Sequence, residues 1–250
     1  MWCGEAVSFA WGPNGRRLAL TLDEIGGNSS YVGFHILNVV SGQDRFLLDR
    51  VGCFPAAELA WSPHGARLAY ICGGRNVGAN GHQIHVLKLR GSSNRTVPTN
   101  SDAFWPSWSR SGTRIAYSTQ LKPSEMSGIY TVALAGSHRR LVARGGAAPA
   151  WSPNGRTIAY QTTCGIRLVT PSGRDVTPKA TSNACGAIGL SGPPVWSPDG
   201  TKLAVETRHR HGIYVMDKSG GALHWVSLGL RETRTWYRAL PGRPSWRPIR

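Results

Sequence analysis

One short segment recurs along this chain, and the recurrence constrains the fold more than any other feature. A tryptophan is followed by a turn sequence that ends in glycine, and the segment returns about every 45 residues. The five copies are Ala10-Trp11-Gly12-Pro13-Asn14-Gly15, Ala60-Trp61-Ser62-Pro63-His64-Gly65, Ser107-Trp108-Ser109-Arg110-Ser111-Gly112, Ala150-Trp151-Ser152-Pro153-Asn154-Gly155 and Val195-Trp196-Ser197-Pro198-Asp199-Gly200. Each copy continues into an apolar triplet, and the triplets are Leu18-Ala19-Leu20, Leu68-Ala69-Tyr70, Ile115-Ala116-Tyr117, Ile158-Ala159-Tyr160 and Leu203-Ala204-Val205.

Each copy predicts a β-hairpin. Proline presets φ at the second position of a tight turn, Asn or Asp tolerates the third, and glycine takes the left-handed position. Tryptophan ends one strand, and the apolar triplet forms the next, whose continuous apolar character fits burial on both faces. Third strands are expected at 33–39, 83–89, 128–134, 166–170 and 212–217, and short fourth strands near 46–48, 95–97, 140–142, 174–176 and 223–226. Four strands for each repeat predict an all-β fold, a β-propeller of four-stranded blades.

The repeat resembles that of the TolB-like, or WD-like, family of propellers, which is also seen in the propeller domain of prolyl oligopeptidase-type peptidases. The motif Trp-Ser-Pro-Asp-Gly-x-x-[Leu/Ile]-Ala-Tyr is almost intact at Trp61, Trp151 and Trp196. Two copies depart from it, with Gly12 in place of serine and Arg110 in place of proline. The resemblance covers nearly the whole chain and implies a fold and a habit of binding partners, although a fold does not determine a function.

The repeats divide the chain into blades of one domain, residues 1–250. Complete blades are expected at 5–50, 54–99, 102–144, 147–180 and 193–228, and a sixth motif copy, Ser245-Trp246-Arg247-Pro248, predicts one strand of a closing blade at 243–247. We therefore expect a six-bladed design that is incomplete at its N-terminus, with the missing strands and any signal peptide upstream of Met1. The alternative is a five-bladed ring in which the last strand acts as a clasp.

Composition agrees with an all-β domain and indicates an anionic partner. The chain has 31 glycines and 16 prolines, too many for a helical protein, and no apolar stretch long enough to span a bilayer. Its net charge is +16, which favours association with polyanions. The arginines are scattered, which also fits a compositional bias. We expect a monomer that binds a protein or an anionic cell-envelope polymer; nucleic acid is compatible with the charge but not favoured.

The five cysteines predict an oxidising compartment. On the blade plan all of them fall on connections at one face, and surface thiols persist best as disulfides outside the cytoplasm. The expected bridges join Cys53 to Cys72 and Cys164 to Cys185, which leaves Cys3 unpaired. A periplasmic or secreted location follows. The alternative is that these residues are small buried side chains in a reducing cytosol.

Motifs of the common enzyme classes are absent from the sequence. There is no Gly-x-Ser-x-Gly run, since residues 189–193 fail at the last position, and no phosphate-binding loop or Cys-x-x-Cys pair. Two histidine pairs, His82 with His85 and His209 with His211, raise the alternative of a metal-dependent polysaccharide lyase. The second pair lies among arginines, whose charge repels a cation. We therefore predict a non-catalytic binding module without metal or cofactor; a peptidase propeller fragment is the other alternative.

Cations just after the hairpin turns predict the binding site. The second position after the turn glycine holds Arg17, Arg67, Arg114 or Lys202, and Arg156 occupies the first position in another blade. Because this hairpin joins the two strands nearest the axis, we expect the cations to ring one mouth of the channel and to bind an anion. The alternative is that each side chain extends into solvent. The recurrent tryptophans are predicted to pack between blades, whereas Trp105, Trp225 and Trp236 are candidates for exposed contacts.

Overall fold

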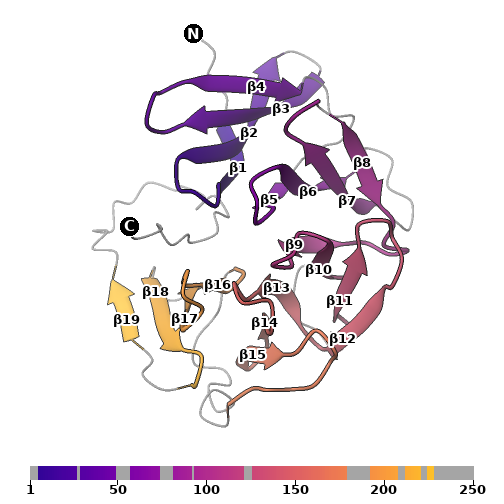
Figure 1. Cartoon of the computed structure of the whole chain (residues 1–250), viewed down its shortest axis with the longest axis vertical. Coiled ribbons are helices and arrows are strands. Elements are labelled where there is room, and N and C mark those ends of the chain that lie inside the picture. Colours follow the sequence, from indigo (N-terminus) through magenta and orange to yellow (C-terminus); the bar gives the residue numbers. More distant parts are fainter. Residues whose placement is uncertain are drawn as a thin grey trace.

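A computed structural model describes residues 5–26, 29–48, 57–73, 81–91, 93–120, 126–178, 192–207, 212–220 and 224–227. These residues form five small antiparallel sheets that are arranged around a common axis (Figure 1). Within each sheet the strand order follows the chain, so that each strand pairs with its neighbours in sequence. The fold is an all-β propeller, and each sheet is one blade.

The strands follow the repeat. Blade one holds β1 (Glu5–Trp11), β2 (Arg17–Gly26), β3 (Ser29–Asn38) and β4 (Asp44–Leu48). Blade two holds β5 (Ala57–Trp61), β6 (Arg67–Gly73), β7 (His82–Lys88) and β8 (Asn94–Val97). Blade three holds β9 (Phe104–Trp108), β10 (Arg114–Ser118), β11 (Gly128–Ala133) and β12 (Arg140–Arg144). Blade four holds β13 (Ala147–Trp151), β14 (Ile158–Thr162) and β15 (Gly165–Val169), and blade five holds β16 (Val195–Trp196), β17 (Lys202–Thr207), β18 (Gly212–Asp217) and β19 (His224–Ser227).

The innermost strand of each blade is its first strand, the one that ends in the recurrent tryptophan. β1 packs on β5, β5 on β9, β9 on β13 and β13 on β16, so the inner strands follow one another around the axis. Blades one and five stand at the two ends of this arc (Figure 1). The predicted strand of a closing blade, 243–247, lies outside the described residues, and five blades are what the structure shows.

The hydrophobic core lies between blades rather than within any one of them. In β6, Leu68 and Tyr70 pack towards blade one, whereas Ala69 and Ile71 pack towards blade three. Successive side chains of a strand point to opposite faces of the sheet, so an uninterrupted apolar run supplies both interfaces at once. This explains why the triplet after each turn carries no alternating polar residue.

Blade four departs from the predicted four strands. The fourth strand expected at 174–176 is reduced to an isolated bridge between Val169 and Asp175. Beside it, the Thr177 hydroxyl accepts a hydrogen bond from the Leu168 backbone N–H (2.9 Å) and donates one to the Leu168 carbonyl (3.2 Å). The Val176 N–H also donates to the Leu168 carbonyl (2.9 Å), so a short backbone pairing remains and the Thr177 side chain extends it. Pro178, which has no N–H, follows directly.

A β-bulge recurs three residues before the tryptophan in blades two to four. Glu58, Trp105 and Ala148 have left-handed φ angles of 59°, 56° and 51°, and the pairing register shifts at each site. The extra residue bends the inner strand away from its partner. The Trp105 backbone N–H donates to the Glu58 carboxylate of the preceding blade, so this bulge is also an interblade contact.

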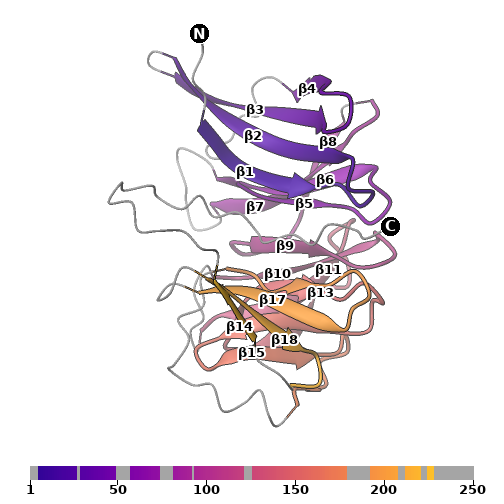
Figure 2. The same cartoon turned by 90° about the vertical axis from the view of Figure 1, so that its left-hand side faces the viewer.

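Blade one has one face that is less covered than the same face of other blades. Leu18 and Leu20 are half-buried, while Leu68 and Tyr70, at the same motif positions in blade two, are fully buried. In addition, β2 and β3 pair over a longer span and extend past the other strands of the blade (Figure 2). Among the described residues, none lies in a helix with the length and apolar character that crossing a membrane requires.

This difference in burial predicts unequal costs for one substitution at equivalent positions. Leu68→Ala should lower the free energy of unfolding by about 2–5 kcal/mol, because it removes a fully buried side chain and leaves a cavity. Leu18→Ala should cost clearly less, because part of that side chain already contacts solvent. Urea unfolding of both variants would measure the two losses. Equal losses would show that the face of blade one is covered as fully as that of blade two.

Candidate functional site

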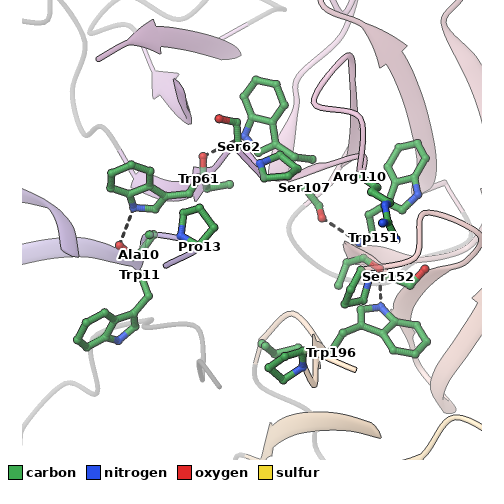
Figure 3. A pocket seen from close by; sticks show the side chains of 18 of the residues that line it. Ala10, Trp11, Pro13, Trp61, Ser62, Ser107, Arg110, Trp151, Ser152 and Trp196 are labelled. Atoms are coloured by element: carbon green, nitrogen blue, oxygen red, sulfur yellow. Dashed lines mark hydrogen bonds between the residues drawn. The ribbon is translucent and has the colours of Figure 1, made fainter. Parts of the chain in front are cut away.

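The first strands of all five blades line a central channel. The channel encloses a cavity of about 470 Å³ whose walls are the ends of β1, β5, β9, β13 and β16 together with the turns that follow them (Figure 3). One mouth opens on what we call the hairpin face, the face that carries the turns 12–15, 62–65, 109–112, 152–155 and 197–200. Tryptophan, proline, alanine and leucine side chains make up most of the lining.

Three of the recurrent indoles bind the preceding blade. The Nε1–H groups of Trp61, Trp108 and Trp196 donate to backbone carbonyls of the residues before the preceding tryptophans (Figure 3). The accepting atoms are the oxygens of Ala10, Ala60 and Ala150, at 2.8, 3.0 and 3.0 Å. Each bond joins two neighbouring blades beside the channel, in agreement with the packing role that the sequence predicts.

The serine of the motif closes the hairpin turn. In blades two to five its buried hydroxyl accepts a hydrogen bond from the backbone N–H five residues later, over 2.9–3.1 Å. These serines are Ser62, Ser109, Ser152 and Ser197. Blade one has Gly12 at this position and lacks the hydroxyl. Its turn is held by backbone bonds, in which the Gly12 N–H donates to the Arg17 carbonyl (2.7 Å), and by the Asn14 side chain, which accepts from the Arg16 N–H (3.2 Å).

The third motif position forms the rim of the mouth. Four of the five blades place proline there, and each of the first three of these prolines lies against the turn glycine of the next blade. A methyl group on Gly65 would lie 3.3 Å from Pro13 Cγ, and one on Gly200 would lie 3.5 Å from Pro153 Cδ. Glycine is therefore favoured at these two positions for two reasons. A side chain would lie close to the proline of the preceding blade, and the φ angles of 66° and 68° are left-handed.

Arg110 is the exception in this rim. It occupies the proline position of blade three, lies against Gly155 of blade four, and is exposed (Figure 3). Among the described residues that line the channel it is the only cation, and no hydrogen-bond or ion-pair partner for its guanidinium occurs in the described part of the chain. In the sequence, Arg110 is recognisable only as a departure from the motif. That departure indicated that a charged side chain occupies the position where the other blades have the apolar side chain of proline.

Two of the five predicted cations connect neighbouring blades. The Arg17 guanidinium donates to the Gly65 carbonyl (3.4 Å) and lies 5.1 Å from the centre of the Trp61 ring. Arg67 donates in the same way to the Gly112 carbonyl (3.5 Å). Both arginines are half-buried and hold the turn of the following blade.

The other three predicted cations lie elsewhere on their own blades. Arg114 donates to the Thr131 hydroxyl (3.0 Å) in the adjacent strand β11, and Lys202 forms an ion pair with Asp217 (2.9 Å) in β18. Arg156 is exposed beside its turn. None of the five predicted cations lines the channel, and their role in binding stays a prediction.

The junction between blades three and four differs from the others. Trp151 Nε1 donates to the Gly155 carbonyl of its own turn (3.0 Å) rather than to the preceding blade. That carbonyl corresponds to those which Arg17 and Arg67 bind in other blades, and Arg114 does not reach it. The Trp151 backbone N–H donates instead to the Ser107 hydroxyl of blade three (2.9 Å; Figure 3).

The histidines of blade two serve separate contacts. His82 and His85 are three residues apart in β7 and therefore point to opposite faces of the blade. His82 lies against Phe104, with ring centres 4.7 Å apart, and His85 lies against Tyr70 at 5.4 Å. Burial lowers the pKa of His85, which favours its neutral form. Among the described residues, no cluster of three or more histidine, cysteine, aspartate or glutamate side chains could hold a metal ion.

Several residues singled out in the sequence lie outside the described part of the chain, namely Cys3, Cys53, Cys185, His209, His211 and Trp236. The structure records Cys72 and Cys164 as disulfide-bonded. Which cysteine each of them pairs with stays a prediction. Trp105 is half-buried in the bulge of β9, and Trp225 belongs to β19 but its side chain is not among those described.

Comparisons with known proteins identify the fold. No protein-family model matches the chain. No curated protein matches it either. Among solved structures, TolB from Acinetobacter baumannii is similar with a TM-score of 0.63 and 15% identity, over 87% of this chain and 53% of TolB. This chain therefore spans about half the length of that protein.

Two further structures widen the comparison. A chain of a nidogen–laminin complex is similar with a TM-score of 0.65 and 11% identity, over 89% of this chain and 80% of that one. An oligogalacturonate lyase in complex with manganese is similar with a TM-score of 0.62 and 12% identity, over 88% and 64% of the two chains. At such identities the likeness concerns the fold alone. The chain is a β-propeller protein, and its function has to be argued from its own site.

The rim contacts predict which turn glycines resist substitution. Gly65→Ala should be more destabilising than Gly42→Ala, although both glycines have similar φ angles of 66° and 72°. Both variants carry the cost of a left-handed alanine, about 1–2 kcal/mol. Only Gly65→Ala also places a methyl group against Pro13 and Arg17, whereas nothing lies within 4 Å of the equivalent position at Gly42. Urea unfolding would compare the two losses, and equal values would mean that the rim does not hold the blades together.

A second prediction concerns the turn of blade five. The Asp199 carboxylate accepts hydrogen bonds from the Ser197 hydroxyl (2.5 Å) and from the Thr201 N–H and hydroxyl (3.0 and 2.8 Å), which lower the pKa of Asp199 from 3.8 to about 2. A carboxyl whose pKa is lower in the folded protein stabilises it above the unfolded pKa and loses that effect as pH falls through the folded pKa.

The stability of the parent relative to Asp199→Asn should therefore decline as pH falls from about 4 to about 2 and stay constant above about pH 5. Asparagine is a suitable replacement because Asn154 occupies the equivalent turn position in blade four. There its side-chain oxygen accepts a hydrogen bond from the Ser152 hydroxyl (2.8 Å). Thermal unfolding across this pH range would measure the difference, and other carboxyl groups cancel between the two proteins. A difference that does not change with pH would contradict the lowered pKa.

Proposed function

We propose that this protein is a non-catalytic binding module that holds an anionic partner at the hairpin-face mouth of its channel. The observation that carries the proposal is the position of Arg110, an exposed guanidinium at the mouth of a largely apolar channel. Concave, mostly apolar sites with a few placed polar groups are typical of ligand-binding sites.

The surroundings of the mouth favour negative charge in a partner. Arg16 and Arg156 follow their turn glycines directly and are exposed on the hairpin face. Neither guanidinium has a hydrogen-bond or ion-pair partner within the described residues. The neighbouring carboxylates are engaged locally, since Asp199 binds its own turn and Asp217 pairs with Lys202. Cations without partners therefore outnumber free acids around the mouth, and such a surface attracts polyanions.

An extracytoplasmic location belongs to the same proposal. Cys72 lies near the end of β6 in blade two and Cys164 follows β14 in blade four, and both are disulfide-bonded. Disulfides persist in oxidising compartments and are rare in the cytosol. Within the described residues no observation favours the lyase or the peptidase alternative. The similar chain from a nidogen–laminin complex comes from a protein assembly, which supports binding as a use of this fold.

Binding of an anionic polymer tests the proposal. Fluorescein-labelled polyglutamate should bind the protein, and its affinity should fall steeply between ~0.1 M and ~1 M salt, where the Debye length shrinks from about 10 Å to about 3 Å. The double variant Arg16→Gln/Arg156→Gln should weaken this binding. The matched control is Arg95→Gln/Arg144→Gln, which removes the same charge from exposed arginines of the outermost strands β8 and β12. Absence of binding, or equal effects of the two double variants, would contradict an anion site at this mouth.

A further inference from the structure

Ser107 breaks the apolar character of the channel wall. The equivalent positions in the other blades hold Ala10, Ala60, Ala150 and Val195, all of which line the channel. Ser107 lines it too, and only 8% of its surface is exposed. Its hydroxyl oxygen accepts the Trp151 N–H at 2.9 Å (Figure 3).

The hydroxyl of Ser107 still has a proton to donate. A serine hydroxyl carries one donor and two acceptor positions, and the bond from Trp151 occupies an acceptor position. No acceptor for the hydroxyl proton occurs among the described residues. A buried donor without an acceptor costs free energy, about 1–3 kcal/mol, unless a ligand or solvent satisfies it. A ligand atom that accepts a hydrogen bond at this point of the channel would remove that cost.

Arg110 follows Ser107 by three residues and lies on the same wall. Two departures from the repeat thus occur in one blade, a hydroxyl inside the channel and a guanidinium at its mouth. Both are hydrogen-bond donors. The walls from blades one, two and five present side chains such as Trp11, Trp61 and Val195. Ser62 and Ser152, the turn serines of blades two and four, line the channel as well, but neither has a charged side chain beside it in its own turn. Blade three therefore provides a donor wall in which the hydroxyl of Ser107 is combined with the guanidinium of Arg110, and the other walls are mainly apolar.

A donor wall of this kind selects a carboxylate. A carboxylate accepts several hydrogen bonds, and its bonds with arginine are among the strong ones in proteins. No carboxylate is present among the described residues of the lining, so a ligand carboxylate meets no like charge there. The apolar walls set a second requirement, because charges that are buried against apolar surface without a partner are costly. The ligand that fits has one acidic group with apolar neighbours.

We propose that Ser107 and Arg110 form a recognition site for an acidic residue of a protein partner, an aspartate or glutamate that is flanked by apolar residues and enters the channel from the hairpin face. This inference rests on the proposed function and narrows it from anionic partners in general to a protein segment. A uniformly charged polymer satisfies the donor wall but leaves its remaining charges against tryptophan and proline.

Selection from a random-sequence peptide library displayed on phage tests this site with the whole chain as the target. The expected result is enrichment of peptides in which one aspartate or glutamate stands between apolar residues. The best peptide, made synthetically, should lose affinity when its acidic residue is replaced by the corresponding amide. Enrichment of uniformly acidic peptides, or of peptides without an acid, would overturn the inference.

Two variants connect the selected peptide to the donor wall. Arg110→Pro introduces the residue that the other blades carry at this position, so the turn is retained, and we expect the peptide to bind at least about tenfold more weakly. Ser107→Ala introduces the alanine of blades one, two and four, and should weaken the peptide about fivefold. Ser111→Ala is the matched control, because Ser111 belongs to the same turn and is exposed outside the lining. Calorimetric titration would measure the affinities, and thermal unfolding would confirm that each variant is folded.

The outcomes separate this inference from the proposed function. If Arg110→Pro leaves peptide affinity unchanged while polyglutamate binding still depends on Arg16 and Arg156, the donor wall is wrong and the anion-binding function stands. If Ser107→Ala unfolds the protein, the result for Arg110→Pro decides alone. If neither the library nor polyglutamate yields binding, both proposals are wrong.

Discussion

Every blade in the interior of this arc buries both faces of its sheet against its neighbours, and the rest of the structure depends on that contact. A small sheet with two apolar faces gains its stability from what covers it, because its own strands enclose no core. The triplets after the turns supply the two faces from alternate residues, as Leu68 and Ala69 do in blade two. Polar contacts then set how neighbouring blades meet, and the indole of Trp108, bound to the carbonyl of Ala60, is an example.

The residues of the turn motif both stabilise the hairpins and form the mouth of the channel. Its serine closes the hairpin, its glycine admits the neighbouring rim residue, and its proline forms the rim of the channel mouth. Because these roles are shared by nearly all blades, the mouth is close to symmetric and mostly apolar. A chemically distinct site in such a ring has to come from residues that break the repeat.

Blade three provides those residues. Arg110 takes a rim position and Ser107 takes a wall position, and the junction that they adjoin is also the one where Trp151 turns its indole to its own hairpin. Arg17 and Arg67, which the repeat itself suggested as binding residues, instead hold the turns of following blades through carbonyl oxygens. Residues at the repeated motif positions thus hold neighbouring blades together, whereas the residues that depart from the motif form the candidate binding site.

The sequence by itself determined the repeat, the strand order within each blade and the positions of the hairpin turns, because the period of the Trp-turn-Gly motif and the steric needs of proline and glycine are local properties. It also indicated that the recurrent tryptophans pack between blades. It did not indicate that the fourth strand of blade four is reduced to an isolated bridge, where the Thr177 hydroxyl adds two hydrogen bonds to a short backbone pairing. Only the tertiary structure decided which partners the cations after the turns contact. The carbonyls and carboxylates that these long side chains bind belong to other strands and blades, and folding brings them near. The place of Arg110 in the rim was decided in the same way, because a mouth exists only once five hairpins from distant parts of the chain meet around one axis.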